Sequence, residues 1–372
     1  MELNDERLDA LLTRARKEVD DGVLSSCQIA VGLDGELVAH EAIGDASTDS
    51  RYVIFSETKA LIAAVMWQLI GEGAVAVDDP VSKHFDEFGA NGKDSITIEQ
   101  VLTHTSGFPR CPMGPPAWAD RNWRVQQMAN WRLNWEPGTR FEYHPTSAHW
   151  VLAEVIARID GVDHRDAVRA RVLAPLGLRK LALGVDPADQ GDVLGLVASG
   201  EGPSAEDLQS VFGVSEYDLG EVTPDVLLMM NEPANRAVGL PGGGAVSTAA
   251  DVAMLYQAFL HNRDGLWDPD VLADGTGNIR CTLPDPILRT PANRTLGLIA
   301  AGADGTSAYR GMGHNVSARA FGHNGAGGQI ALADPETGLS FCYLTNGIDR
   351  NFLREARRVS GIASRAALLT RP

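Results

Sequence analysis

The sequence predicts an α+β fold, with a mainly antiparallel sheet flanked by helices and a mostly helical domain inserted between its strands. Strand-like runs near both ends of the chain are the first observation behind this prediction. Residues 26–33 and 36–42 are apolar runs separated by Asp34-Gly35, a strong hairpin signal, and residues 328–333 and 339–345 form a second pair. Helical patterns between the two pairs are the second observation. Strands at both ends with helices between them imply that the two ends of the chain meet in one sheet.

The predicted helices follow in chain order. An amphipathic helix runs from near the N-terminus to about Asp21, and an almost wholly apolar core helix spans residues 60–69. Further helical patterns occupy residues 149–159, 167–173 and 249–260, and a last helix begins at about Asn351. We therefore expect a discontinuous sheet-and-helix domain, residues 1–75 plus 285–372, and a mostly helical insertion, residues 76–284.

Residues 56–59, Ser-Glu-Thr-Lys, stand where an apolar, β-prone run ends and the core helix begins. Residues three apart share a face of a helix, so the Lys59 amine is expected over the Ser56 hydroxyl. Such a lysine can take the serine proton only if burial or another cation lowers its pKa, and the apolar helix predicts the burial. The alternative is that Ser56 only caps the helix while Lys59 extends into water.

Four more segments carry recognisable motifs in order along the chain. They are residues 102–109 (LTHTSGFP), 141–145 (FEYHP), 240–251 (LPGGGAVSTAAD) and 321–328 (FGHNGAGG). With Ser56 and Lys59 they resemble the serine β-lactamase and penicillin-binding-protein superfamily, in particular its class C-like branch with related esterases and D-peptidases. The resemblance runs from about residue 26 to about residue 350. It implies a β-lactamase/transpeptidase-like fold and a serine hydrolase of the carboxylesterase type.

The resemblance also implies roles for individual residues. Ser56 is similar to the nucleophile of that superfamily, Lys59 to its general base and Tyr143 to the tyrosine that assists proton transfer. By motif position, the backbone N–H groups of Ser56 and Ala326 would form the oxyanion hole. Residues 141–145 look like the second motif of the superfamily and residues 321–328 like its third. The third motif would contact substrate through His323, Asn324 and Gly325.

Two positions depart from the superfamily pattern. Pro145 stands where asparagine is usual, and proline has no side-chain donor to hold an acyl amide. His323 stands where many β-lactamases carry lysine, and a mostly neutral histidine attracts a substrate carboxylate less strongly. Both departures favour neutral esters over β-lactams and peptides.

Composition narrows the range of partners. The chain has 372 residues, 44% of them hydrophobic, and a net charge of -17, which argues against nucleic acid and anionic membranes as partners. The charged N-terminal segment lacks the pattern of an export signal, so we expect a cytoplasmic protein. Buried, reduced thiols are expected for the strand residues Cys27 and Cys342, and the other cysteines are Cys111 and Cys281. No motif implies a cofactor or a metal, no apolar run is long enough for a bilayer, and no pattern indicates an oligomeric state.

Three functions from different classes fit these observations. The first is a carboxylesterase that cleaves small-molecule esters through an acyl-enzyme on Ser56, with Lys59 and Tyr143 handling the proton. The second is a β-lactamase, D-peptidase or amidase with the same nucleophile, disfavoured by Pro145 and His323. The third is a non-catalytic relative that keeps the fold for binding, which the presence of Ser56, Lys59 and Tyr143 together disfavours.

Overall fold

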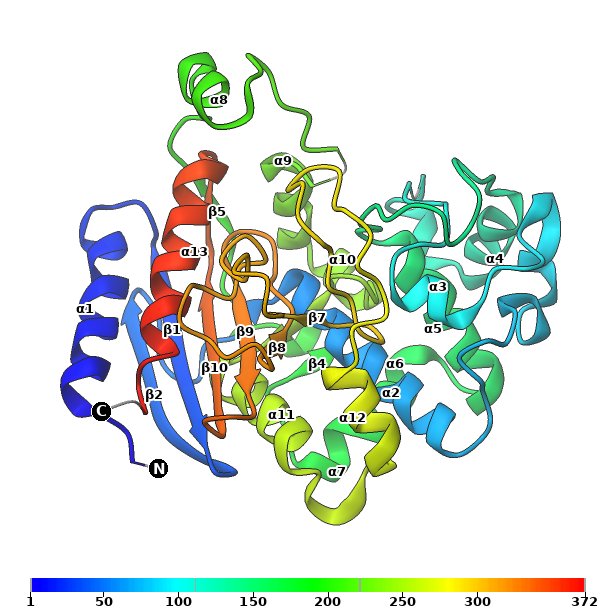
Figure 1. Cartoon of the computed structure of the whole chain (residues 1–372), viewed down its shortest axis with the longest axis horizontal. Helices are drawn as coiled ribbons and strands as arrows, with labels where there is room; N and C mark the ends of the chain where they lie inside the picture. Colours follow the sequence, from blue (N-terminus) through cyan, green and yellow to red (C-terminus); the bar gives the residue numbers. More distant parts are fainter. Residues whose placement is uncertain (1, 111, 221, 371–372) are drawn as a thin grey trace.

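A computed structural model gives the structure of residues 2–110, 112–220 and 222–370 (Figure 1). Its main sheet has six antiparallel strands in the order β2-β1-β10-β9-β8-β7. The strands are β1 (Ser26–Leu33), β2 (Glu36–Gly44), β7 (Ile299–Ala300), β8 (Phe321–Gly322), β9 (Ile330–Asp334) and β10 (Leu339–Thr345). Strands from both ends of the chain are therefore neighbours, and the α+β prediction is confirmed.

The two predicted hairpins are both present. β1 and β2 join through Asp34 and Gly35, which both have positive φ as a tight hairpin turn requires. β9 pairs with β10 in the second hairpin. β1 is buried along its whole length, so both faces of the sheet are covered.

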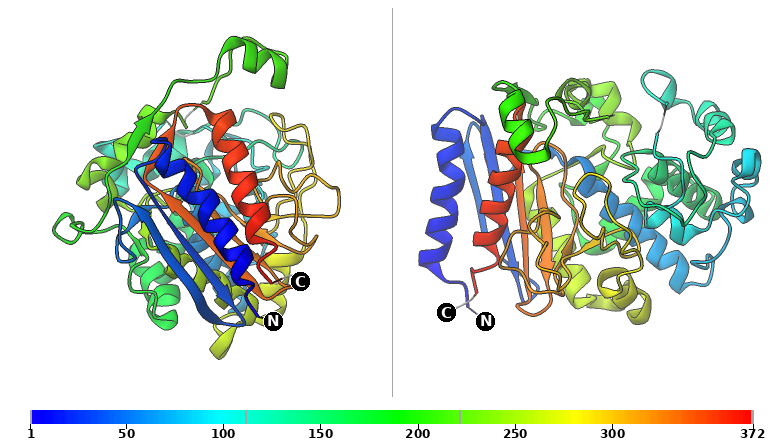
Figure 2. Two further views of the ribbon diagram at one scale, coloured as in Figure 1. Left: turned by 90° about the vertical axis from the view of Figure 1, so that its left-hand side faces the viewer. Right: turned by 45° about the horizontal axis from the view of Figure 1, so that its top comes forward.

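Alternate residues of the central strands belong to two separate cores. Ile29 of β1 and Phe341 of β10 pack in the core beneath the terminal helices α1 (Asp5–Asp20) and α13 (Phe352–Ala366). Ala30 and Cys342 pack in the larger core on the other face. α1 and α13 lie side by side over the sheet (Figure 2), and Asn4 donates its backbone N–H to the Leu369 carbonyl at 2.8 Å. The period-2 pattern of the strands thus produces a three-layer arrangement.

The opposite face of the sheet is covered by α11 (Ala249–His261), which contacts β1, β9 and β10. Behind α11 lies α2 (Lys59–Gly71), whose residues from Lys59 to Leu69 are all buried, as its apolar sequence predicts. α11 falls inside the range predicted as the insertion, yet it packs on the sheet. The division of the chain into domains stays a prediction.

Most of the remaining elements are short and helical. The helices are α3 (Ile98–Leu102), α4 (Arg121–Asn130), α5 (Ser147–Asp160), α6 (His164–Val168), α7 (Ala174–Leu176), α8 (Ala205–Phe212), α9 (Pro224–Leu228), α10 (Pro233–Val238) and α12 (Pro269–Gly277). Two small sheets accompany them, β3 (Tyr52–Val53) with β6 (Ala245–Ser247) and β4 (Ala182–Leu183), and β5 (Val197–Ser199) with β11 (Gly347–Asp349). α3 to α6 form a helical region beside the sheet, and α8 projects from the body (Figure 1).

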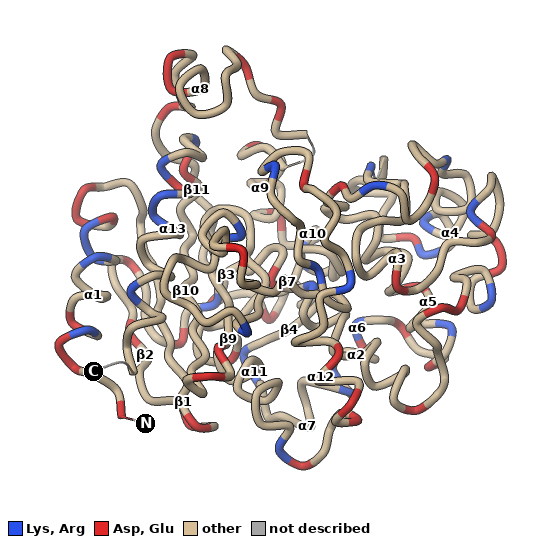
Figure 3. The backbone as a smooth tube through the Cα atoms, in the orientation of Figure 1, with Lys and Arg blue, Asp and Glu red and all other residues tan. Residues whose placement is uncertain are grey.

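Charge and hydropathy agree with this arrangement. Acidic residues are spread along the backbone of the sheet region and the helical region alike (Figure 3), in keeping with the net charge of -17. In the part of the chain that the structure describes, no helix combines the length and the apolar character needed to cross a membrane. Cys27 and Cys342 are buried on β1 and β10, as predicted, whereas Cys111 lies outside the described residues.

Candidate active site

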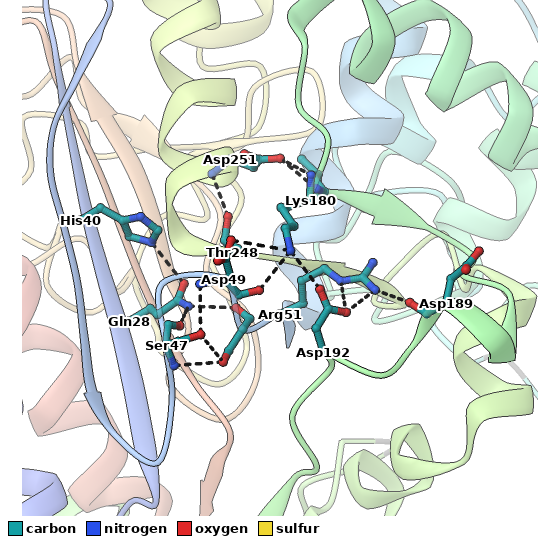
Figure 4. A network of polar contacts seen from close by, with 12 residues as sticks. Gln28, His40, Ser47, Asp49, Arg51, Lys180, Asp189, Asp192, Thr248 and Asp251 are labelled. Atoms are coloured by element: carbon teal, nitrogen blue, oxygen red, sulfur yellow. Dashed lines mark hydrogen bonds and ion pairs between the residues drawn. The ribbon is translucent and has the colours of Figure 1, made fainter.

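The turn that carries Ser56 is anchored by the residues that precede it. β3 pairs with β6, and Arg51, just before β3, donates through Nε to the Asp192 carboxylate at 2.8 Å. The Lys180 amine lies 3.2 Å from the same carboxylate, and the network continues to Asp251 at the start of α11 (Figure 4). These contacts join segments that are far apart in the sequence. They hold the beginning of β3, the short strand that leads into the Ser56 turn.

Ser56 lies on a 3₁₀ turn, Phe55–Thr58, that leads directly into α2. In a 3₁₀ helix, side chains three residues apart are nearly eclipsed, which places Lys59 over Ser56 as the spacing predicts. Phe55 has φ of 45°. This left-handed conformation is unusual for an aromatic residue and costs about 1–2 kcal/mol. The turn that carries Ser56 is thus held in a strained geometry by the packing around it.

Lys59 is fully buried, with Nζ 3.1 Å from Ser56 Oγ. Nζ also donates to the Pro145 carbonyl at 2.7 Å and to the Gly242 carbonyl at 2.5 Å. Burial lowers the pKa of Lys59 well below its usual range, and the charge of Arg294 lowers it further. A neutral amine has two N–H donors, which the two carbonyls take up, and its lone pair remains for the Ser56 proton. The environment of Lys59 suits a general base.

Tyr143 reaches Ser56 from the segment before α5. Its hydroxyl donates to Ser56 Oγ at 2.9 Å, and the Lys59 amine lies 5.1 Å from the centre of its ring. Burial raises the pKa of Tyr143, although Arg294 and the bond to Ser56 act in the opposite direction. Tyr143 is therefore a neutral phenol at neutral pH and a proton donor in the resting site.

The third motif lies against the other side of the turn that carries Ser56. Gly325 follows β8 and comes so close to the chain before Ser56 that a Cβ would meet the Ile54 carbonyl oxygen at 2.4 Å. The Asn324 amide donates to the Gly311 carbonyl at 2.9 Å, so its donor already holds a neighbouring loop. His323 is buried, and burial lowers its pKa well below the usual range, so it is neutral. Ala326 is partly exposed beside Ser56.

A cavity of about 310 Å³ opens beside Ser56. Ser56 and Ala326 lie in its wall, and most of its other lining residues are apolar. The apolar ones include Phe55, Met113, Trp118, Val226, Leu227 and Met230. Its volume is at the lower end of the range for small-molecule sites. Most of the wall comes from two segments of the middle of the chain, residues 113–118 and 222–230.

Three histidines surround the far side of Tyr143. Burial lowers the pKa of His104, His144 and His149, so all three are neutral. His104 bonds the backbone, because its Nδ1 accepts from the His144 backbone N–H at 3.2 Å. Among the described residues, no group of three or more His, Cys, Asp or Glu side chains is placed to hold a metal ion.

With this geometry established, similarity to known proteins can be assessed. Residues 11–363 match the family described as Beta-lactamase. The chain belongs to the beta-lactamase family. The esterase/beta-lactamase LipL of Mycobacterium tuberculosis is 27% identical to it over 344 residues, which are 86% of this chain and 76% of LipL. Membership and this relative support a serine hydrolase of the beta-lactamase family.

Two solved structures of the same superfamily have a similar fold. A penicillin-binding-protein homologue from Caulobacter crescentus superposes with a TM-score of 0.78 at 24% identity, over 98% of this chain and 99% of that one. A family VIII carboxylesterase superposes with a TM-score of 0.79 at 22% identity, also over 98% and 99% of the two chains. The β-lactamase/transpeptidase-like fold that the motifs imply is thereby confirmed.

One residue of this beta-lactamase family site was missed by the motif analysis. Arg294 is buried, and its Nη1 lies 3.2 Å from His323 Nε2. The centre of its guanidinium lies 5.1 Å from the centre of the Tyr143 ring. The sequence signal was an arginine two residues before the apolar run of residues 296–301. It belongs to no motif, so only the folded arrangement reveals it.

Proposed function

We propose that this protein is a serine carboxylesterase that cleaves small-molecule esters through an acyl-enzyme on Ser56. The observation that carries the proposal is the convergence of two groups on one oxygen: Lys59 Nζ at 3.1 Å and the Tyr143 hydroxyl at 2.9 Å from Ser56 Oγ. A base and an acid are thus in place around one nucleophile. The presence of all three groups in contact argues against a non-catalytic relative.

In the acylation step, Ser56 Oγ attacks the ester carbonyl as neutral Lys59 takes its proton. The resulting ammonium is stabilised by the carbonyl oxygens of Pro145 and Gly242, which already contact it. Tyr143 donates its proton to the leaving alkoxide. The Lys59 ammonium then gives its proton to the Tyr143 oxygen, which restores the neutral amine and the neutral phenol. The alcohol leaves, and the acyl group remains as an ester of Ser56.

In the deacylation step, a water molecule takes the place of the alcohol. Lys59 and Tyr143 act together to accept its proton as it attacks the acyl-enzyme, and the proton returns to Ser56 Oγ. Free acid and the resting hydroxyl are the products. The backbone N–H groups of Ser56 and Ala326, which lie in the wall of one cavity, would stabilise the oxyanion in both steps.

The cavity suits the acyl part of the substrate. The leaving oxygen has to face Tyr143, yet Tyr143 is not among the described residues that line the cavity, whereas Ser56 and Ala326 are. The acyl group therefore extends into the cavity and the alcohol lies on the Tyr143 side. An apolar wall with no amide donor from Pro145 favours an apolar acyl group in an ester.

A second candidate function is hydrolysis of β-lactams or D-amino-acid amides by the same nucleophile. The relative LipL is named as both an esterase and a beta-lactamase, which favours including this alternative. A panel of p-nitrophenyl esters with acyl chains of increasing length, measured beside a chromogenic cephalosporin, tests both. A higher kcat/KM for the esters than for the cephalosporin supports the proposal. Comparable values for a cephalosporin and a butyrate ester contradict it.

The nucleophile is tested separately. An organophosphonate probe should label the intact protein once, and Ser56→Ala should abolish both labelling and turnover, whereas the exposed Ser47→Ala is the matched control. Labelling at another serine would refute the assignment. A cytoplasmic location and the exclusion of nucleic acid and membrane partners remain predictions from the sequence.

A further inference from the structure

Arg294 occupies an uncommon position for an arginine. Only 7% of its surface is exposed, and its guanidinium lies between the faces of two aromatic rings, with its centre 5.1 Å from the Tyr143 ring centre and 5.4 Å from that of Phe141. Nη1 lies 3.2 Å from His323 Nε2, and a neutral imidazole nitrogen can accept that bond. One charged side chain thus contacts both the second and the third motif.

Among the described residues, no carboxylate pairs with this buried charge. No ion pair of Arg294 is present among the described residues, and its buried Nε has no hydrogen-bond acceptor there. Arg310, which is equally buried, shows the usual solution: it pairs with Asp304 and donates to backbone carbonyls. A buried cation without compensation is costly, so its retention beside Tyr143 needs a reason.

The other titratable groups around Lys59 and Tyr143 add no charge. Burial lowers the pKa values of the imidazoles, which are His104, His144, His149 and His323. Glu57, next to Ser56, is fully buried without a hydrogen-bond partner among the described residues, and burial raises its pKa well above the usual range. The charges of Asp285 and Arg310 influence the pKa of Arg294 by electrostatic interaction, without a hydrogen bond to it. Arg294 is the permanent charge that Lys59 and Tyr143 experience.

We propose that Arg294 is a positioning residue whose fixed positive charge keeps Lys59 neutral and ready to take the proton of Ser56. The inference rests on the proposed function and adds a residue outside the three motifs. His323 provides no charge at the third motif, and Arg294, in contact with His323, supplies a cation from a different segment. A fixed cation favours the neutral form of Lys59, and it opposes the burial effect on Tyr143 by stabilising a developing phenolate.

The pH profile of kcat/KM for a neutral ester tests this proposal. The acidic limb reports protonation of the free enzyme's base, so loss of the cation should raise the pKa of Lys59 and move that limb to higher pH. Lys59 Nζ and the centre of the Arg294 guanidinium each lie 5.1 Å from the centre of the Tyr143 ring, so the two are at most about 10 Å apart. At an effective dielectric constant of about 20, the expected shift is then about one pH unit. Arg294→Met should show the shift with activity recovering at high pH, whereas Arg294→Lys should keep the limb near its original position.

Two controls separate the possible results. Arg280→Gln removes a positive charge from a partly exposed arginine that pairs with Glu99 and Asp274, and it should leave the limb unchanged. The pH dependence of organophosphonate labelling repeats the measurement without turnover, and thermal melts establish that each variant is folded. If Arg294→Met does not fold, Arg294→Lys and Arg294→Gln provide the comparison of charged and neutral side chains.

The outcomes distinguish this inference from the proposed function. An unchanged acidic limb in folded Arg294→Met or Arg294→Gln overturns the inference. So does a rise in KM confined to esters that carry a carboxylate, which would make Arg294 a substrate anchor instead. Neither result affects Ser56-dependent turnover in the wild type. Absence of that turnover would refute the proposed function itself.

Discussion

The Lys59 amine contacts the backbone carbonyl of Pro145, at a distance of 2.7 Å. In the superfamily that the motifs resemble, an asparagine side chain at this position helps to hold the lysine. Here a main-chain oxygen performs that task, and it is independent of the side chain. The loss of asparagine at Pro145 therefore removes a donor for the substrate amide without disturbing the lysine.

We predict that Pro145→Asn leaves ester turnover within a few-fold of wild type and raises turnover of amides. The Lys59 contact uses a backbone carbonyl that asparagine also has, while the new side-chain amide can bond an acylamino group. The ratio of kcat/KM for a chromogenic cephalosporin to that for a butyrate ester measures the change. An unchanged ratio in a folded variant would show that Pro145 does not restrict amide substrates.

Lys59 and Tyr143 should behave as one proton-handling unit. Groups that act as a unit are non-additive, so Lys59→Ala, Tyr143→Phe and the double variant should each lose roughly a thousandfold or more in kcat/KM, with the double variant little worse than either single one. Both groups contact the same Ser56 oxygen, which is the physical reason. If Tyr143→Phe keeps near wild-type activity while Lys59→Ala is inactive, the tyrosine is only part of the pocket wall.

Filling the cavity should shorten the acyl chains that the site accepts. Val226→Phe and Met230→Trp place larger side chains in the wall, so kcat/KM for octanoate esters should fall at least tenfold relative to acetate esters. Acetate itself should be affected little, because it needs only the space beside Ser56. Val211→Phe, at an exposed position on α8, is the matched control. Equal losses for both chain lengths would refute the placement of the acyl group in this cavity.

The close packing of Gly325 should make it intolerant of a side chain. In Gly325→Ala the new Cβ would lie 2.4 Å from the Ile54 carbonyl oxygen, so the third-motif segment or the chain before Ser56 must shift. We expect a loss of stability of about 1–3 kcal/mol and a fall in kcat larger than the change in KM. Chemical denaturation and steady-state kinetics measure the two effects. Gly277→Ala, at a glycine that like Gly325 lacks a positive φ and where a Cβ would meet no atom within 4 Å, is the matched control.

Much of the fold follows from local patterns in the sequence. The Asp34-Gly35 hairpin, the terminal helices and the apolar core helix depend on neighbouring residues, and they form as predicted. The contact of Lys59 with Ser56 also depends on a spacing of three residues. Tyr143 could be assigned because its motif is recognisable, although the sequence gives no distance to Ser56.

Other features depend on contacts between distant segments and could not be predicted. Nothing near Arg294 in the sequence shows that it will lie on the Tyr143 ring, because that contact arises only when a strand edge meets the second motif. The Gly242 carbonyl reaches Lys59 for the same reason. The sequence argument assumed that His323 leaves the third motif without a cation, whereas the buried Arg294 stands beside it.

Phe55 has two roles that are mechanically linked. Its backbone takes up the strained conformation that precedes Ser56, and the residue also lines the cavity beside Ser56. The rest of the wall comes mainly from loops and short helices that carry none of the proposed catalytic groups, so those loops can vary with the substrate while the chemistry is conserved. Phe55 differs from these loops because it directly precedes Ser56. Evolution or redesign of substrate range in this scaffold should therefore proceed through residues 113–118 and 222–230 and leave Phe55 constant.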